Sequence, residues 1–316
     1  MSGDESSANA EYDFEPIAEG IVFARALRSG TALSNSAIVD LGATTLVFDT
    51  GLTLRAAREL WAESGRASGR GPGLVVNSHW HFDHLLGNQL FAGAEIYATN
   101  GTIEYLLRNR SDLEQELTVE SIGSLVREIE SAGPGSATPT AAQVEEYEVS
   151  LKVNRQLLQE APGIRLTPPV IPFEAELDLP GGRSARLLTF GPGHTESDGL
   201  LWLPKERVLF AGDLVVSKCH PSLLTSQPEH WLEVLAQIER LGPRCIVPGH
   251  GPLATVETIA EVRSYIETLT RLAKDSGQAG LPEEFRSWTD PGIFPQNVAY
   301  LRRRAKATSE EKSGVA

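Results

Sequence analysis

The chain has 316 residues, of which 28 are basic and 42 acidic, and its formal net charge is −14. This acidity argues against a partner made of nucleic acid or an anionic membrane, because most of the surface would repel a polyanion. Runs of about 18 apolar residues and a secretory leader are both missing from the sequence, so no membrane contact and a cytoplasmic location are expected.

The N-terminal half alternates short apolar runs with turn residues. Residues 1–15 are acidic and rich in small side chains, which predicts a disordered lead-in, and residues 16–300 are expected to form one domain. A helix is predicted from 52 to about 63 by the spacing of its apolar residues. Strands are predicted over 20–28, 34–42, 44–51, 74–79 and 95–99.

Residues 100–161 change character and are predicted to form a helical insertion. Two capping-box patterns indicate helix starts, Ser111 with Glu114 and Thr140 with Gln143. A glycine- and proline-containing linker at 131–139 separates them. Few residues of obvious chemistry lie in this stretch, so it is not expected to supply catalytic groups.

The strand pattern resumes after the insertion. Helices are predicted at 229–241 and 255–273, with His230 exposed on the first, and a charged tail that frays is predicted over 301–316. Strands are predicted over 170–173, 175–179, 185–190, 199–203, 207–213 and 245–250. Strands followed by a helix in each half indicate two sheets packed together with helices outside.

Three of the seven histidines lie within six residues, in the segment NSHWHFDHLLGN. His79 and His81 are two positions apart, so in an extended segment their side chains point the same way, whereas Trp80 and Phe82 point into the core. Asp83 and His84 follow where the strand gives way to a helix. Imidazoles and a carboxylate that converge in this way indicate a metal site.

Three further ligand-like residues stand in matching contexts. His194 in GPGHTESDG, Asp213 in RVLFAGD and His250 in VPGHGP each follow an apolar strand beside glycine, which lets the backbone approach a shared centre. All seven candidate residues are histidines or aspartates, so their ligand atoms are nitrogen or oxygen. Such a set suits two zinc ions, with manganese or iron as alternatives.

The pattern His79-x-His81-x-Asp83-His84, with His194, Asp213 and His250 downstream, resembles the metallo-β-lactamase superfamily from about residue 20 to 273. The resemblance implies an α+β fold, an αββα sandwich of two mixed sheets flanked by helices. It further implies that a first ion is held by His79, His81 and His194, a second by Asp83, His84 and His250, and that Asp213 bridges the two.

Such a centre predicts a zinc metallo-hydrolase. Two ions lower the pKa of a shared water, and the resulting hydroxide attacks the carbonyl of a thioester, ester, lactone or lactam, with Asp83 as the catalytic group that orients it and moves a proton. Asp213, where one lactamase class has cysteine, makes the chain more similar to the glyoxalase II, lactonase and acyl-hydrolase branches. The alternatives are an iron persulfide dioxygenase and a phosphodiesterase or nuclease. The complete ligand set argues against the first, and the negative charge argues against the second.

Two features are expected to act on a small-molecule substrate. Lys218 and His220 lie in a loop close to Asp213 and are predicted to contact it. The helical insertion is predicted either to cap the metal edge and shape the substrate pocket or to form the interface of a homodimer.

Overall fold

The computed structural model describes residues 10–135, 138–275, 277 and 279–313, and within them two β-sheets stack face to face. In the larger sheet the first four strands pair antiparallel and the remainder parallel. Its strands, in spatial order, are β1 (Tyr12–Ala18), β2 (Ile21–Ala26), β3 (Ser36–Asp40), β4 (Thr45–Phe48), β5 (Pro72–Val76), β6 (Glu95–Thr99) and β7 (Ile171–Phe173).

The smaller sheet has five strands, among which only β11 and β12 pair parallel. In spatial order they are β12 (Cys245–Pro248), β11 (Val208–Gly212), β10 (Leu200–Leu203), β9 (Arg186–Leu188) and β8 (Glu176–Asp178). Apolar side chains from both sheets, Phe48 and Phe210 among them, form a continuous buried core between the sheets.

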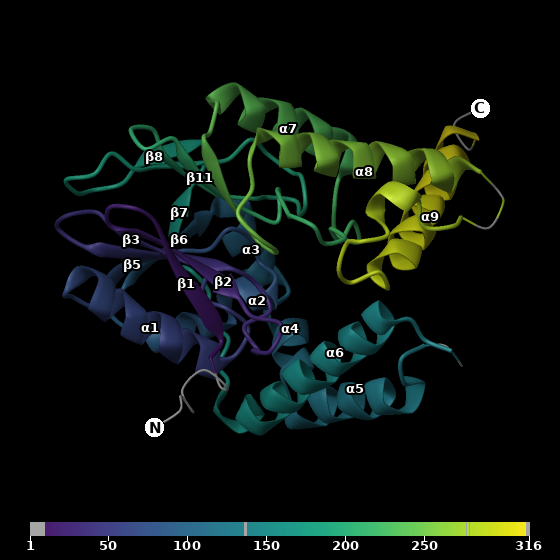
Figure 1. The fold of residues 1–316 in the computed structure, drawn as a ribbon, viewed down its shortest axis with the longest axis horizontal. Coiled ribbons are helices and arrows are strands. Elements are labelled where there is room, and N and C mark those ends of the chain that lie inside the picture. The colour runs from purple at the N-terminus through teal and green to yellow at the C-terminus, as the bar shows by residue number, and fades with distance from the viewer. Residues whose placement is uncertain (1–9, 136–137, 276, 278, 314–316) are drawn as a thin grey trace.

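Helices cover the outer faces of both sheets (Figure 1). Helix α1 (Leu54–Ser68) packs on the larger sheet, and α7 (Pro228–Leu241), α8 (Val256–Lys274) and α9 (Ile293–Ser313) lie on the side of the smaller one. Helix α1 packs on the larger sheet and α7 and α8 on the smaller one, which gives the layered αββα arrangement, while α9 packs on α8. The predicted fold class is therefore confirmed.

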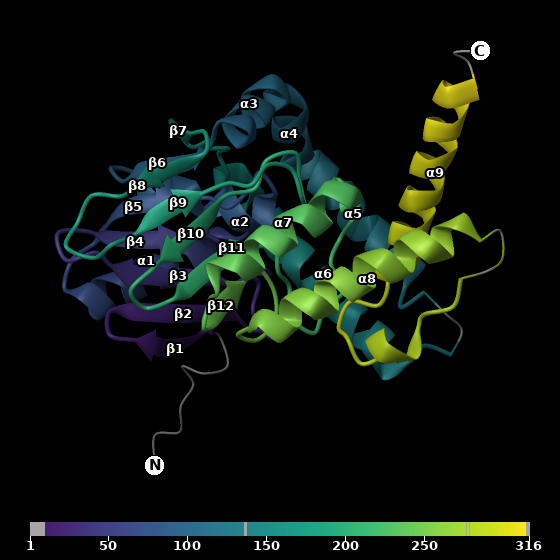
Figure 2. The same ribbon diagram turned by 90° about the horizontal axis from the view of Figure 1, so that it is seen from above.

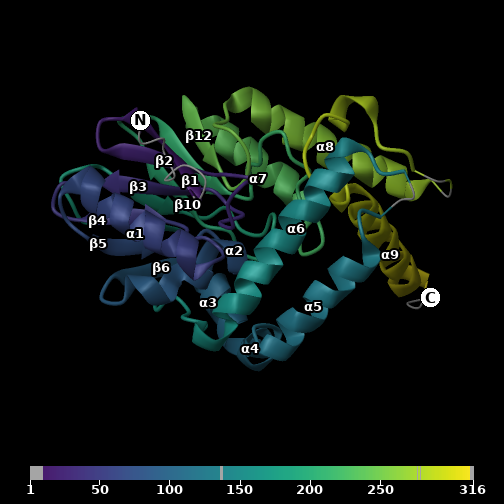
Figure 3. The same ribbon diagram turned by 60° about the horizontal axis from the view of Figure 1, so that its bottom comes forward.

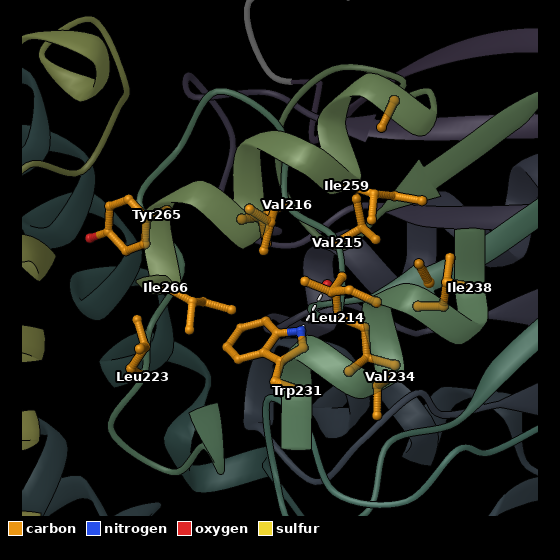
Figure 4. Packing of buried hydrophobic residues seen from close by; sticks show 14 of the residues in the cluster. Leu214, Val215, Val216, Leu223, Trp231, Val234, Ile238, Ile259, Tyr265 and Ile266 are labelled. Atoms are coloured by element: carbon orange, nitrogen blue, oxygen red, sulfur yellow. Dashed lines mark hydrogen bonds between the residues drawn. The ribbon is translucent and has the colours of Figure 1, made fainter. Parts of the chain in front are cut away.

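Trp231 of α7 is fully buried beneath the smaller sheet (Figure 4). It packs among aliphatic side chains that include Val234 and Ile266, and its Nε1 donates a hydrogen bond to the carbonyl oxygen of Leu214, 3.1 Å away. Leu214 directly follows Asp213, so this core contact also fixes the backbone beside a predicted ligand.

The segment predicted as an insertion forms helices α3 (Asn100–Arg108), α4 (Arg110–Glu116), α5 (Val119–Ala132) and α6 (Ala141–Glu160). Helices α5 and α6 lie side by side (Figures 2 and 3). Glu160, at the end of α6, accepts hydrogen bonds from the N–H groups of Leu54 and Arg55 at the start of α1. Buried apolar side chains of the insertion, Leu113 and Val153 among them, pack against Leu85 and Leu86. The insertion is therefore anchored next to the histidine cluster.

One of the two predicted helix starts is correct. Thr140 and Gln143 form a reciprocal capping box at the start of α6. The prediction at Ser111 is wrong, because α4 begins at Arg110 after Asn109 and Ser111 already lies inside the first turn. Thr99 and Thr118 are caps in this region that were not predicted: their side chains accept hydrogen bonds from the N–H groups of Thr102 and Ser121, at the starts of α3 and α5.

Both predicted chain ends need correction. Strand β1 begins at Tyr12, a buried residue whose strand pairs with β2, so the lead-in predicted over 1–15 is too long; residues 1–9 lie outside the described part. The tail predicted over 301–316 is helical up to Ser313, because Leu301 is buried against α8 and the rest of that core; residues 314–316 are not described.

The remaining helical segments are short. They are helix α2 (Phe82–Leu85) and 3-10 turns at 86–91, 161–163 and 283–285. Within the ranges that the structure describes, no helix combines the length and the apolar character needed to cross a membrane.

Candidate metal centre

The predicted ligands come together at one edge of the sandwich. His79 and His81 follow β5, whereas Asp83 and His84 lie on the short helix α2. The other three occupy loops after strands of the smaller sheet: His194 after β9, Asp213 after β11 and His250 after β12. The seven side chains fall into two groups, each compact enough to hold an ion.

The first group consists of His79, His81 and His194 with one oxygen of Asp213. Nδ1 of His81 lies 3.0 Å from Nε2 of His79 and 3.0 Å from Nε2 of His194. Oδ2 of Asp213 lies 3.4 Å from Nε2 of His194. Ligands about 2.0–2.2 Å from a tetrahedral ion are roughly 3.3–3.6 Å apart, so these spacings are close to those of a zinc site.

The second group consists of Asp83, His84 and His250. Nε2 of His84 is 3.4 Å from Oδ2 of Asp83, and Nε2 of His250 is 3.3 Å from the same oxygen. Oδ1 of Asp213 is 3.3 Å from His84 Nε2 and 3.4 Å from His250 Nε2. The two oxygens of Asp213 therefore face different groups, as a bridging carboxylate requires.

The donor atoms fit a pair of cations. His84 Nε2 and Asp213 Oδ1 are buried and have no hydrogen-bond partner among the described residues. Unpaired buried polar atoms are costly, and an ion placed between them removes that cost. Cys219 belongs to neither group, and burial raises the pKa of its thiol well above the usual value, so the donors are nitrogen and oxygen alone.

Each first-group imidazole is oriented through its other nitrogen. Nδ1 of His79 contacts Ser78 Oγ at 2.9 Å, and Nδ1 of His194 contacts the carbonyl oxygen of Ser222 at 3.1 Å. Nε2 of His81 contacts Thr225 Oγ1 at 3.3 Å. Such contacts fix which nitrogen faces the ion.

Asp49 contacts a candidate ligand and was not predicted from the sequence. It is buried, and its Oδ2 lies 2.8 Å from Nδ1 of His84. A signal was present: TTLVFDTG ends an apolar strand with an aspartate, as RVLFAGD does for Asp213. The sequence pattern predicts only a strand end at this position.

Without metal, the histidines of the two groups differ in the direction of their pKa shifts. Burial lowers the pKa of His81 to about 3 and that of His79 well below its ordinary value. Burial also opposes a charge on His250, but Asp213 and Asp83 outweigh it and raise that pKa to about 10. His79 and His81 are thus neutral imidazoles, whereas an ion at the second group would have to displace the proton of His250.

Lys218 and His220, the predicted substrate contacts, lie at different depths. Lys218 is exposed and its Nζ lies 2.5 Å from Oε1 of Glu261. His220 is buried, with Nδ1 3.0 Å from the hydroxyl of Tyr265. His230, predicted to be exposed, is half-buried, and its Nδ1 contacts the carbonyl oxygen of Pro192, which steadies the loop before His194.

A cavity of about 270 Å³ reaches from Asp213 and His250 to helix α6. A neighbouring cavity of about 210 Å³ shares His250 and is lined by Lys218. A larger hollow of about 790 Å³, between the α5–α6 turn and the segment before α9, touches none of the seven candidate ligands. Of these three cavities, the two smaller ones reach the candidate ligands.

Trp80 packs on apolar residues, as predicted, but it does not point away from the candidate ligands, because its ring meets that of His81 edge-on with centroids 4.4 Å apart. Its ring stacks on Tyr105 of α3 with centroids 4.0 Å apart, and it lies against the apolar cluster of the insertion. Packing of this kind joins the histidine segment to the insertion.

Comparison with known proteins identifies the family. The model of the metallo-beta-lactamase superfamily matches residues 30–250, and the chain belongs to that superfamily, whose members are largely metal-dependent hydrolases. The crystal structure of DIM-1 metallo-beta-lactamase aligns with a TM-score of 0.58 at 19% identity, over 82% of this chain and 98% of that one. This likeness concerns the fold.

Two curated relatives are similar to this chain over part of their sequences. The Beta-lactamase-like protein 2 homolog of Caenorhabditis elegans is 33% identical over 95 residues, 30% of this chain and 30% of the relative. The Linear primary-alkylsulfatase of Pseudomonas sp. (strain ATCC 19151) is 23% identical over 261 residues, 80% of this chain and 47% of the relative. The chain thus spans less than half the length of either relative.

Proposed function

We propose that this protein is a dinuclear zinc hydrolase that cleaves a carbonyl-centred bond in a small-molecule substrate. The observation that carries the proposal is the position of Asp213, whose two carboxylate oxygens face two separate groups of candidate ligands. His79, His81 and His194 would hold one ion, and Asp83, His84 and His250 the other. When bound, two zinc ions would supply hydroxide near neutral pH and stabilise the developing oxyanion.

Asp83 is proposed to act on the substrate as well as to bind metal. Its carboxyl is partly buried, and this desolvation acts to raise its pKa, yet the neighbouring His84 holds that pKa well below the ordinary value, so it remains a carboxylate. A carboxylate at the centre can accept a proton from the attacking water and deliver it to the leaving group. His250, within 3.3 Å of Asp83 Oδ2, limits the positions that this oxygen can take.

Other predictions remain part of the proposal. Lys218 and His220 are proposed substrate contacts, since each lines one of the two cavities beside His250. Manganese or iron are the alternatives to zinc, because the donor set lacks sulfur. The cytoplasmic location, the lack of a nucleic-acid partner and a homodimer stay predictions from the sequence.

The test is a hydrolysis panel on purified, zinc-loaded protein with Asp83→Asn as the blank. The panel contains a glutathione thioester, an acyl-CoA, a lactone, a neutral ester, a β-lactam and a phosphodiester. We expect the parent to cleave one carbonyl class and the variant to lose that activity. Cleavage of the phosphodiester alone would move the protein to the nuclease branch, and a single iron per chain without hydrolysis would favour the dioxygenase.

A sulfate ester is the second candidate substrate. The match to a linear primary-alkylsulfatase over 80% of this chain supports its inclusion. Dodecyl sulfate therefore belongs in the same panel, with sulfate release as the readout. Sulfate release without cleavage of any carbonyl compound would replace the carbonyl proposal.

A further inference from the structure

We propose that the cavity between the metal centre and helix α6 binds an uncharged, apolar acyl group, so that the substrates are neutral esters or lactones. This inference rests on the proposed hydrolase function and names its substrate class. Three observations support it: the apolar lining of the cavity, the sign of the charges beside it, and the pairing of every cation in the neighbouring cavity.

The lining of the cavity is largely apolar, and its apolar side chains come from four separate parts of the chain. These parts are the loop after β2, helix α6, the loop after Asp213 and the start of α9. The apolar lining residues are Leu33, Val149, Val153, Val216, Pro221 and Ile293. At about 270 Å³ the cavity has the volume of roughly nine water molecules, taking ~30 Å³ for each, which accommodates a medium-length acyl chain.

The charged residues on this lining, apart from the candidate ligands Asp213 and His250, are Glu146 and Asp290. Glu146 is half-buried and accepts a hydrogen bond from Gly292 N–H at 3.1 Å. Asp290 is paired with Arg28 at 3.1 Å. An acyl group that ends in a carboxylate would meet Glu146 without a counter-ion, and like charges brought together across a binding surface are strongly unfavourable.

The neighbouring cavity does contain cations, but each is already paired. Arg25 lies 2.5 Å from Asp13, and Lys218 lies 2.5 Å from Glu261. Arg28 bonds both Glu145 of α6 and Asp290. To bind an anionic group, one of these cations would first have to leave its carboxylate. Acyl-CoA, glutathione thioesters and lactams that carry a carboxylate are therefore poor matches.

Charge selectivity provides the first test. Zinc-loaded protein is assayed with the hexanoyl ester and the adipoyl monoester of one phenol, which differ by a terminal carboxylate. We expect kcat/KM to favour the hexanoyl ester by about tenfold or more, because the carboxylate faces Glu146. Glu146→Gln should narrow this ratio several-fold. Glu148→Gln, the same change at an exposed residue of α6 outside this cavity, should leave the ratio unchanged.

Chain length provides the second test. Ile293→Trp fills the cavity and should lower kcat/KM for the hexanoyl ester about tenfold while the acetyl ester stays within about twofold. Leu107→Trp, at an exposed position of α3, is the matched control. Zinc content is measured for every variant, so that a lost ion is not mistaken for a filled pocket. Equal loss on both esters, with zinc retained, would contradict an acyl pocket at this place.

Calorimetric titration with hexanamide separates this inference from the proposed function. Hexanamide binding that Ile293→Trp weakens, without hydrolysis of any ester, would keep the apolar pocket and reject the hydrolase. Hydrolysis with the adipoyl ester preferred would keep the hydrolase and overturn the pocket assignment. If hexanamide does not bind and ester cleavage shows no dependence on charge or length, the inference is rejected.

Discussion

The carboxylate of Asp49 lies 2.8 Å from Nδ1 of His84, at the end of β4 and beneath the second group of candidate ligands. Its other oxygen accepts a hydrogen bond from the Ser78 N–H at 2.7 Å. Since Nδ1 of His84 donates to Asp49, Nε2 is the nitrogen left to face Asp83 and Asp213. We therefore propose that Asp49 is a positioning residue, which leaves Nε2 of His84 as the nitrogen available to an ion.

Asp49→Asn should weaken the second ion selectively. The amide keeps an acceptor for Ser78 but removes the negative charge behind His84, and loss of such outer contacts typically costs about 10–100-fold in metal affinity. Competition titration against a zinc-binding dye measures both affinities. Asp178→Asn, at an exposed residue of β8, is the control. An equal fall for both ions would show that Asp49 supports the fold in general and not His84 in particular.

Removing Asp213, which faces both groups, should change the number of bound ions differently from removing a ligand of one group. Asp213→Ala takes an oxygen from each group, so we expect both ions to be weakened and hydrolysis to be lost. Asp83→Asn alters the second group alone, so about one ion per chain should remain. Elemental analysis after gel filtration gives the stoichiometry. Two tightly held ions in Asp213→Ala would refute the bridging role.

The sequence was sufficient to predict the seven candidate ligands because each stands in a recognisable local context. Histidines alternate at the end of β5, and His194, Asp213 and His250 each follow an apolar strand and a glycine. The contacts behind them depend on pairing between segments far apart in the chain. Asp49 and His84, or Ser222 and His194, meet only once the fold has formed, so spacing alone cannot reveal them.

Contacts that form only in the folded chain also explain the error at the C-terminal end. Charge along 301–316 predicted fraying, but a helix with one apolar face is stable when it packs, and Leu301 is buried against the layer that α8 belongs to. For the insertion, the sequence predicts either a cap or a dimer interface. The lining of the cavity by α6 favours the cap, and Arg28, which joins Glu145 to Asp290, ties α6 to the segment before α9.

Trp231→Phe should destabilise the protein by about 2–3 kcal/mol, because it leaves a gap in a fully buried site and the carbonyl of Leu214 without its donor. Urea unfolding of the zinc-free protein measures the change. Trp61→Phe, at a position that is 51% exposed, should change stability by less than about 0.5 kcal/mol. Similar effects of the two substitutions would contradict the packing argument.

Removal of metal should lower thermal stability. Ions that bind only the folded chain stabilise it by mass action, by about 4 kcal/mol when free metal is a thousand times its dissociation constant. Dialysis against a chelator should therefore lower the melting temperature, and added zinc should restore it. His194→Ala, which lacks one first-group ligand, should show a smaller response to zinc than the parent. A melting temperature that is the same with and without zinc would exclude tight binding.

His220 should make the protein less stable in mild acid. Its ring is enclosed by Tyr265, Trp288 and Phe294, and burial lowers its pKa to about 4, although Asp290 acts in the opposite direction. An unfolded histidine has a pKa near 6.5, so below that pH the unfolded chain binds a proton that the folded chain does not. Stability contributed by the neutral ring is therefore complete above about pH 6.5 and is lost as the pH falls towards 4.

His220→Gln should remove this part of the pH dependence. Between pH 7.5 and pH 5 the parent should lose about 1–2 kcal/mol more unfolding free energy than the variant, a range reduced from the full shift because the ring borders a solvent-reaching cavity. Both proteins are unfolded in urea with saturating zinc, so that titration of the candidate ligands is suppressed equally. If the two proteins lose the same free energy, the ring of His220 accepts a proton within the folded protein, and its surroundings are wetter than the aromatic enclosure implies.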